Sequence, residues 1–154
     1  MITKTPPAAM PLPARLGPGD VLAIETPQGT RHVQITHIRA PYPDVLRAIT
    51  PNGATDASAV AKGSTAFVAM VELGRALADG AGGIQFIGHA SLPAADRAFP
   101  TFRLPIRDKA GNIVYWWAWD GEGLTVSPEA ANSSLPIREI LPFDSLRQRL
   151  AGLG

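Results

Sequence analysis

The sequence contains no cysteine, little charge and no long apolar run. Without cysteine the chain has no disulfide, no thiol nucleophile and no cysteine-ligated zinc, which fits a reducing compartment, and we expect a cytoplasmic location. No stretch approaches the ~18 consecutive apolar residues of a membrane-spanning helix, so we expect no membrane partner. The net charge of +1, with arginines scattered among acids, argues against nucleic acid as a partner, because phosphate binding requires a concentrated basic surface.

The length of 154 residues is typical of one domain with a core of its own. Residues 1–18 carry five of the 15 prolines and lack the continuous apolar segment of a signal peptide. We therefore predict a flexible, proline-rich tail over residues 1–18 that contributes little to stability. A single β-rich domain is predicted to occupy residues 19–154.

Short apolar or alternating segments between proline and glycine turns predict a mainly β fold. The predicted strands are residues 20–25, 31–39, 45–49, 65–71 and 84–89, followed by a hairpin from 101 to 119. About seven short strands with few helices favour one partly open barrel or a strongly bent antiparallel sheet.

Two short helical pieces complete the predicted fold. The spacing of Leu73, Ala76 and Leu77 indicates a mid-chain helical turn that ends at Gly80. Residues 143–150 predict a short C-terminal helix with Asp144 as its N-cap. Residues 50–64 are small and polar and predict a loop.

The hairpin gives the clearest local signal. Residues 108–111 (Asp-Lys-Ala-Gly) fit a type I turn followed by a glycine bulge. An uninterrupted ladder from this turn places Trp116 opposite Leu104, with Phe102 on the same, buried face. Pro105 then falls at a non-hydrogen-bonded pair and requires an edge or a break on its other side.

All three tryptophans lie within residues 116–119. The predicted register places Trp116 on the buried face and the other aromatic side chains of the second strand on the outer face. Two arginines of the first strand and the acidic residue that follows the tryptophans lie with them. This candidate binding surface comprises Arg103, Arg107, Tyr115, Trp117, Trp119 and Asp120. It is either internal packing, including a cation–π contact between Arg103 and Trp117, or an exposed aromatic surface for a partner or a second copy.

The three histidines do not form a ligand pattern. His32 and His37 are five residues apart in one predicted strand and so point to opposite faces. His89 ends another strand, with Asp96 as the nearest acid in sequence. Zinc requires three or four convergent donors, so we expect no metal and no cofactor. His37 is a candidate buried polar residue.

No catalytic motif is present, and we expect a chain without a catalytic residue. The serines lack the Gly-x-Ser-x-Gly context of a nucleophile, and residues 80–83 (Gly-Ala-Gly-Gly) lack the lysine of a phosphate-binding loop. Residues 120–123 (Asp-Gly-Glu-Gly) lack the further ligands of a calcium loop and predict a polar turn.

Several short motifs resemble those of a group of small bacterial proteins that have no characterised function. The motifs, which span residues 18–147, are Gly19-Asp20-Val21, Gln34-x-Thr36-His37, Tyr42 with Leu46-Arg47, Phe99-Pro-x-Phe-Arg103, Trp116-Trp-x-Trp-Asp-Gly121 and Leu135-Pro-Ile-Arg138. This group is similar to the immunity proteins of bacterial polymorphic-toxin systems, some of which open with a Gly-Asp strand. The resemblance implies a small non-enzymatic protein, and it assigns no functional residues.

Three functions remain open at this point. The first is a non-enzymatic, protein-binding domain of the immunity type. The second is a small nucleic-acid-binding β-barrel, which requires Arg31, Arg39, Arg47, Arg103 and Arg107 to converge. The third is a small-molecule carrier or an enzyme with a polar pocket around His37 or Asp120.

The histidine pattern generates a first prediction. Elemental analysis of protein purified without an affinity tag is expected to find no stoichiometric zinc, nickel or iron. One equivalent of metal that is lost in a His32→Gln or His89→Gln variant would contradict this expectation.

Overall fold

The computed structural model describes residues 16–126 and 135–153, which form eight strands in two antiparallel sheets. The predicted mainly β class and bent antiparallel sheet are confirmed, and the described strands close no barrel. No helix within these residues has the length and apolar character that crossing a membrane requires.

The larger sheet contains the first five strands in the order β4-β3-β2-β1-β5. Its members are β1 (Asp20–Thr26), β2 (Gly29–His37), β3 (Asp44–Ile49), β4 (Thr65–Val71) and β5 (Ile84–His89). All four pairings are antiparallel, so β4 and β5 are the edge strands.

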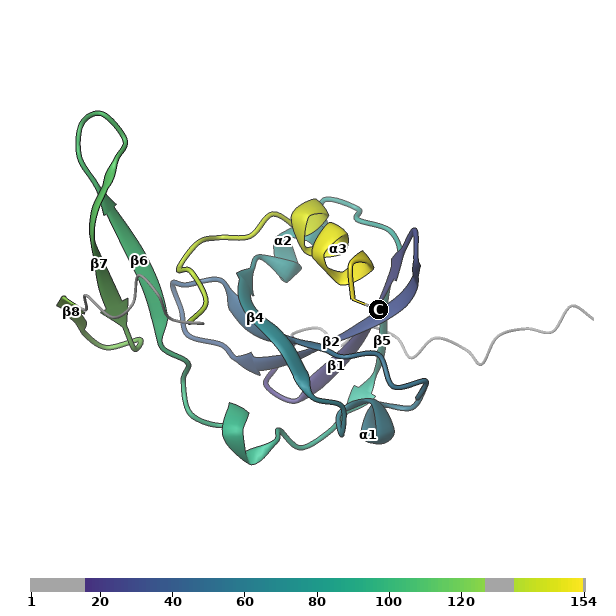
Figure 1. The fold of residues 1–154 in the computed structure, drawn as a ribbon. Coiled ribbons are helices and arrows are strands. Elements are labelled where there is room, and N and C mark those ends of the chain that lie inside the picture. The colour runs from purple at the N-terminus through teal and green to yellow at the C-terminus, as the bar shows by residue number, and fades with distance from the viewer. Residues whose placement is uncertain (1–15, 127–134, 154) are drawn as a thin grey trace, which may run out of the picture.

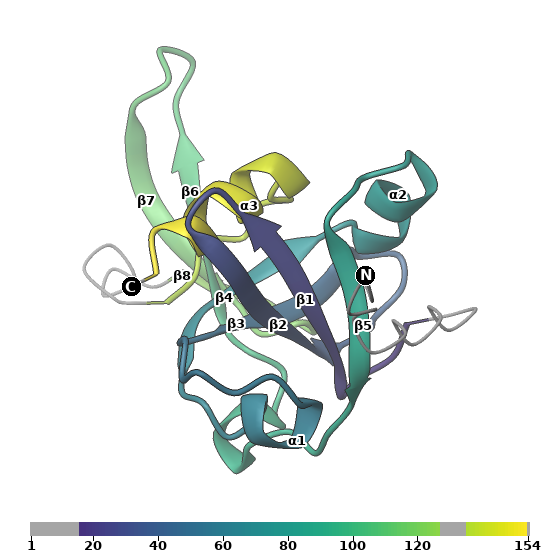
Figure 2. The same cartoon turned by 90° about the vertical axis from the view of Figure 1, so that its right-hand side faces the viewer.

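The smaller sheet has the order β6-β7-β8 and extends away from the body of the molecule (Figures 1 and 2). It consists of β6 (Phe102–Arg107), β7 (Ile113–Trp119) and β8 (Leu124–Val126). The strand β8 lies beyond the polar turn at residues 120–123 and was not expected from the sequence.

The helices are short. They are α1 (Ala57–Val60), α2 (Leu73–Ala78) and α3 (Phe143–Ala151), with a single 3-10 turn at Ala94–Asp96. The helix α1 falls in the predicted loop, where the Asp56 side chain accepts a hydrogen bond from the Ala59 N–H. Asp144 is not the N-cap of α3, because Pro142 occupies that position and Asp144 lies in the first turn.

One face of the larger sheet carries the main core. Alternate residues such as Leu22, Val33, Leu46 and Ala69 are buried there, and the helices α2 and α3 lie over this face in Figure 1. Leu146 and Leu150, which lie four residues apart in α3, are both fully buried. Leu16 also packs against this cluster, so packing begins inside the predicted tail, whose residues 1–15 lie outside the described chain.

The opposite face holds two smaller apolar clusters. Val21, Ile49 and Val60 form the first, under α1, and Val45, Met70, Phe102 and Trp119 form the second, where the smaller sheet joins the body. Gln34 and Arg47 are directly paired neighbours on β2 and β3, and both are 0% exposed. Two buried polar side chains therefore lie on the sheet face that carries both clusters.

The Arg47 guanidinium is bound by neutral oxygen atoms. Its Nε donates to Gln34 Oε1 (2.9 Å), its Nη2 to the Ala61 carbonyl (2.7 Å) and its Nη1 to the Gly63 carbonyl (3.0 Å). Nη1 also donates to the Thr65 hydroxyl (3.1 Å), which in turn donates to Asp96 (3.0 Å). Burial lowers the pKa of Arg47, and the Asp96 carboxylate acts in the opposite direction.

The turn of the β6–β7 hairpin has the predicted form. The Asp108 N–H donates to the Asn112 carbonyl (2.9 Å), and the Asp108 carboxylate accepts from the N–H groups of Ala110 and Asn112 (2.9 and 3.0 Å). Gly111 has φ +88°, a conformation that glycine adopts without steric cost. Arg107 faces Ile113, the first pair that follows from this turn.

The predicted register beyond this first pair is wrong. The ladder shifts between Ile106 and Arg107, which leaves Val114 as an extra residue in β7. Leu104 consequently faces Trp117 rather than Trp116. Phe102 faces Trp119, whereas the uninterrupted ladder pairs Phe102 with Ala118. The bulge thus places an indole ring instead of a methyl group in the second cluster, where Trp119 packs on Tyr42, Phe99 and Phe102.

The observed register predicts which tryptophan stabilises the fold. Replacement of Trp119, which is 4% exposed, by alanine is expected to lower the free energy of unfolding by ~3 to 5 kcal/mol. Trp116→Ala removes a partly exposed ring that stacks on Arg103 and is expected to cost about 1 kcal/mol. Urea unfolding of both variants measures the two losses. The uninterrupted register predicts the opposite result, a larger loss for Trp116→Ala than for Trp119→Ala.

Arg47 supplies a second stability prediction. An Arg47→Met variant keeps much of the volume and leaves the oxygens of Gln34, Ala61 and Gly63 without their donor. We expect a loss of about 3 kcal/mol in the free energy of unfolding. Arg75, whose side chain is 75% exposed, is the matched control, and Arg75→Met is expected to change the value by less than about 0.5 kcal/mol. Equal effects of the two substitutions would refute the structural role of Arg47.

Candidate functional site

Residues 135–141 connect the two sheets, and we call them the connecting segment. Beside β6, the Arg103 N–H donates to the Pro136 carbonyl (2.8 Å), and the Arg138 N–H donates to the Arg103 carbonyl (2.7 Å). Further along, the Leu141 N–H donates to the Met70 carbonyl on β4 (2.8 Å). Both contacts are parallel bridges, so the segment runs first along one sheet and then along the other.

Pro105 explains why the segment changes sheets. A continued parallel ladder along β6 requires an N–H group at Pro105, and proline has none. Arg103 directs its N–H and carbonyl groups toward the connecting segment, so Pro105, two residues on, faces Trp116 at a non-hydrogen-bonded pair of β6 and β7. Pro105 therefore costs the hairpin nothing, and the predicted break beside it is present.

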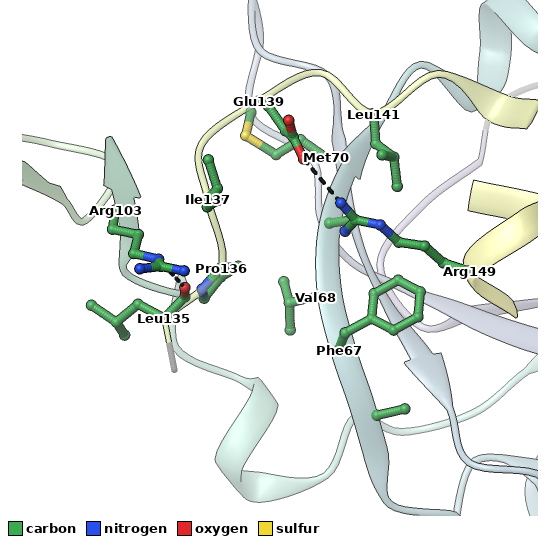
Figure 3. A pocket seen from close by; sticks show the side chains of 12 residues that line it. Phe67, Val68, Met70, Arg103, Leu135, Pro136, Ile137, Glu139, Leu141 and Arg149 are labelled. Carbon is green, nitrogen blue, oxygen red and sulfur yellow. Dashed lines mark hydrogen bonds and ion pairs between the residues drawn. The ribbon is translucent and has the colours of Figure 1, made fainter. Parts of the chain in front are cut away.

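A cleft of about 360 Å³ lies between β4 and the connecting segment (Figure 3). The side chains of Phe67 and Val68 border it from β4, and those of Pro136 and Ile137 border it from the other side. Arg149 reaches over from α3 to pair with Glu139 (3.2 Å). This volume lies within the range of ligand-binding clefts.

The smaller sheet presents a continuous apolar face. Trp117 pairs with Leu104 and Val126, and Tyr115 pairs with Ile106, so these side chains share one side of the sheet. We define the apolar face as Leu104, Ile106, Tyr115, Trp117, Leu124 and Val126. Tyr115, Leu124 and Val126 are 44%, 43% and 59% exposed, whereas Phe102 and Trp119, at the base of the same face, are buried.

The structure divides the candidate binding surface predicted from the sequence. Tyr115 and Trp117 lie together on the apolar face, with ring centroids 6.4 Å apart. Trp119 is buried, and Arg103 lies on the opposite side, where its guanidinium stacks on Trp116 (4.7 Å) rather than on Trp117. The one-residue shift at Val114 accounts for both differences from the predicted surface, the burial of Trp119 and the stacking of Arg103 on Trp116.

The two remaining residues of that surface belong to turns. Arg107 is exposed, and its Nη1 donates to the Gly111 carbonyl (2.9 Å). Asp120 Oδ1 accepts hydrogen bonds from the N–H groups of Gly123 and Glu122 (2.9 Å each), and these bonds lower the pKa of Asp120. Asp120 thus closes the turn between β7 and β8, as the polar-turn interpretation predicts.

The histidines occupy separate places. His37 is partly exposed rather than buried, and its ring nitrogens contact the Thr36 hydroxyl and the Arg97 carbonyl (2.9 Å each). His89 Nδ1 pairs with Asp20 (3.1 Å) rather than with Asp96. Burial lowers the pKa of His32. Among residues 16–126 and 135–153, no three or more acidic or histidine side chains are grouped for metal binding.

The five arginines named for a nucleic-acid surface are held at different places. Arg47 is buried, Arg31 donates to the Leu150 and Leu153 carbonyls at the end of α3, and Arg39 donates to the Gly121 carbonyl. Arg103 donates to the Leu135 carbonyl beside the cleft (3.0 Å). The structure does not bring the five guanidinium groups together.

The cleft was not recognised in the sequence. Two signals for it were present: Pro105 required a break beside β6, and residues 135–138 formed one of the conspicuous motifs. Neither signal could indicate β4, because contact between β4 and residue 140 joins parts of the chain that are 70 residues apart.

No protein-family model matches the sequence, and neither a curated protein nor a solved structure is significantly similar to it.

Proposed function

We propose that the chain is a non-enzymatic domain that binds another protein through the apolar face of its smaller sheet. The observation that supports this proposal is the exposure of Tyr115, Leu124 and Val126 on a face that is continuous with the core. Contiguous exposed apolar surface is unusual on a soluble protein unless another molecule covers it. Tyrosine and tryptophan are also, together with arginine, the side chains that are enriched among the residues that dominate binding energy in protein interfaces.

The chemistry of this face favours protein over nucleic acid. All six of its side chains are uncharged, and binding of a phosphate backbone depends on lysine and arginine. The motifs that resemble bacterial immunity-type proteins support a toxin protein as the partner. A carrier or enzyme receives less support, because neither His37 nor Asp120 lines the cleft of Figure 3.

Site-specific photo-crosslinking in the organism that encodes the chain tests this function. Benzoylphenylalanine replaces Tyr115 in one variant and Gln85, an exposed residue of the edge strand β5, in the control. We expect a discrete crosslinked product with a second protein from position 115 and none from position 85. Addition of Val126→Ser is expected to reduce that product at least tenfold while changing the free energy of unfolding by less than about 0.5 kcal/mol.

Three results contradict the proposal. The first is the absence of a discrete product at position 115, and the second is an equal product at both positions. The third is a product that contains only two copies of this chain, which would make the apolar face a homodimer interface.

A further inference from the structure

Two open strand edges face each other across the cleft of Figure 3. On β4, Met70 turns its carbonyl away from β3 to accept the Leu141 N–H, so Val68, two residues earlier, turns its N–H and carbonyl the same way. In the connecting segment, Pro136 and Arg138 bond to β6, so the N–H and carbonyl of Ile137 point away from β6. Among the described residues, no backbone group bonds to Val68 or Ile137 across the cleft.

The positions of both edges are fixed by the fold. Val68 lies directly beside the buried Arg47 in the sheet register, and Ile137 is held by the two hydrogen bonds of its neighbours to Arg103. The connecting segment joins β4 at Met70 and β6 at Arg103, which sets the two ends of the cleft. Open strand edges of this kind are templates for an additional strand.

An occupant between two edges must have both of its own edges free. Each described strand, β1 to β8, already pairs with at least one neighbour, so none of them in a second copy has both edges available. The occupant is therefore an extended segment without a sheet of its own. The described side chains around it are mainly apolar and include Phe67, Val68 and Ile137. This lining favours apolar side chains in the occupant.

We propose that the cleft binds an extended, apolar peptide segment of a partner protein as a strand added between β4 and the connecting segment. The backbone groups of Val68 and Ile137 provide the hydrogen bonds, and the apolar side chains that border the cleft select the sequence. This site is separate from the apolar face and goes beyond the proposed function.

The test uses a displayed library of random ten-residue peptides, selected on the full chain. Selected peptides are expected to carry apolar residues at alternate positions. Calorimetry then compares one synthetic selected peptide on the wild type, on Val68→Pro and on the control Val68→Thr. Proline removes the N–H that faces the cleft and is tolerated at a strand edge, whereas threonine keeps it. We expect Val68→Pro to weaken binding at least tenfold and Val68→Thr to stay within about threefold.

A thermal unfolding curve establishes that Val68→Pro is folded. If it is not, Ile137→Pro and its control Ile137→Thr take its place, because the Ile137 N–H is not used by β6. The proposal is overturned if no peptide is enriched, or if the proline and threonine variants bind the peptide equally. It is also overturned if the proline variant changes the oligomeric mass in sedimentation equilibrium, since a second copy is then the occupant.

Peptide binding and the proposed function can fail independently. A Tyr115→Ser/Val126→Ser variant is expected to keep its affinity for the selected peptide, because neither residue borders the cleft. Loss of photo-crosslinking at position 115 leaves the peptide result unaffected.

Discussion

The buried guanidinium of Arg47 is the interaction on which the arrangement of the larger sheet depends. It lies fully buried on the face that carries both smaller clusters and binds Gln34, the loop after α1 and the start of β4. Gln34 extends the network to the Gly19 and Ala90 carbonyls. Because a buried cation without acceptors is very costly, the Arg47 side chain fixes the positions of these three chain segments relative to β3.

A missing hydrogen-bond donor shapes the rest of the molecule. Pro105 ends the pairing between β6 and the connecting segment, which then continues to β4 at Met70. The same proline thus joins the smaller sheet to the body and leaves two strand edges facing one cleft. The fold produces a candidate peptide site through the absence of one N–H group.

The apolar face and the cleft arise because a face of the smaller sheet and an edge of the larger sheet are only partly covered by other parts of the described chain. The apolar face begins in the core at Phe102 and Trp119 and continues outward to Tyr115 and Val126, which are half exposed. The cleft edge at Val68 begins beside the same cluster, in which Val68 and Met70 take part. The two surfaces share a supporting cluster, so a Trp119 substitution that loosens it is expected to affect both.

Local chemistry determined a large part of this structure from the sequence alone. The turn at Asp108–Gly111, the strands 65–71 and 84–89, the helix ended by Gly80 and the edge position of Pro105 follow from residues close together in the chain. Tertiary packing decided the rest. The bulge at Val114 places Trp119 rather than Ala118 beside Tyr42 and Phe99, partners that are distant in sequence. The cleft depends on contacts of residues 135–141 with both β4 and β6, and no local pattern encodes such long-range pairings.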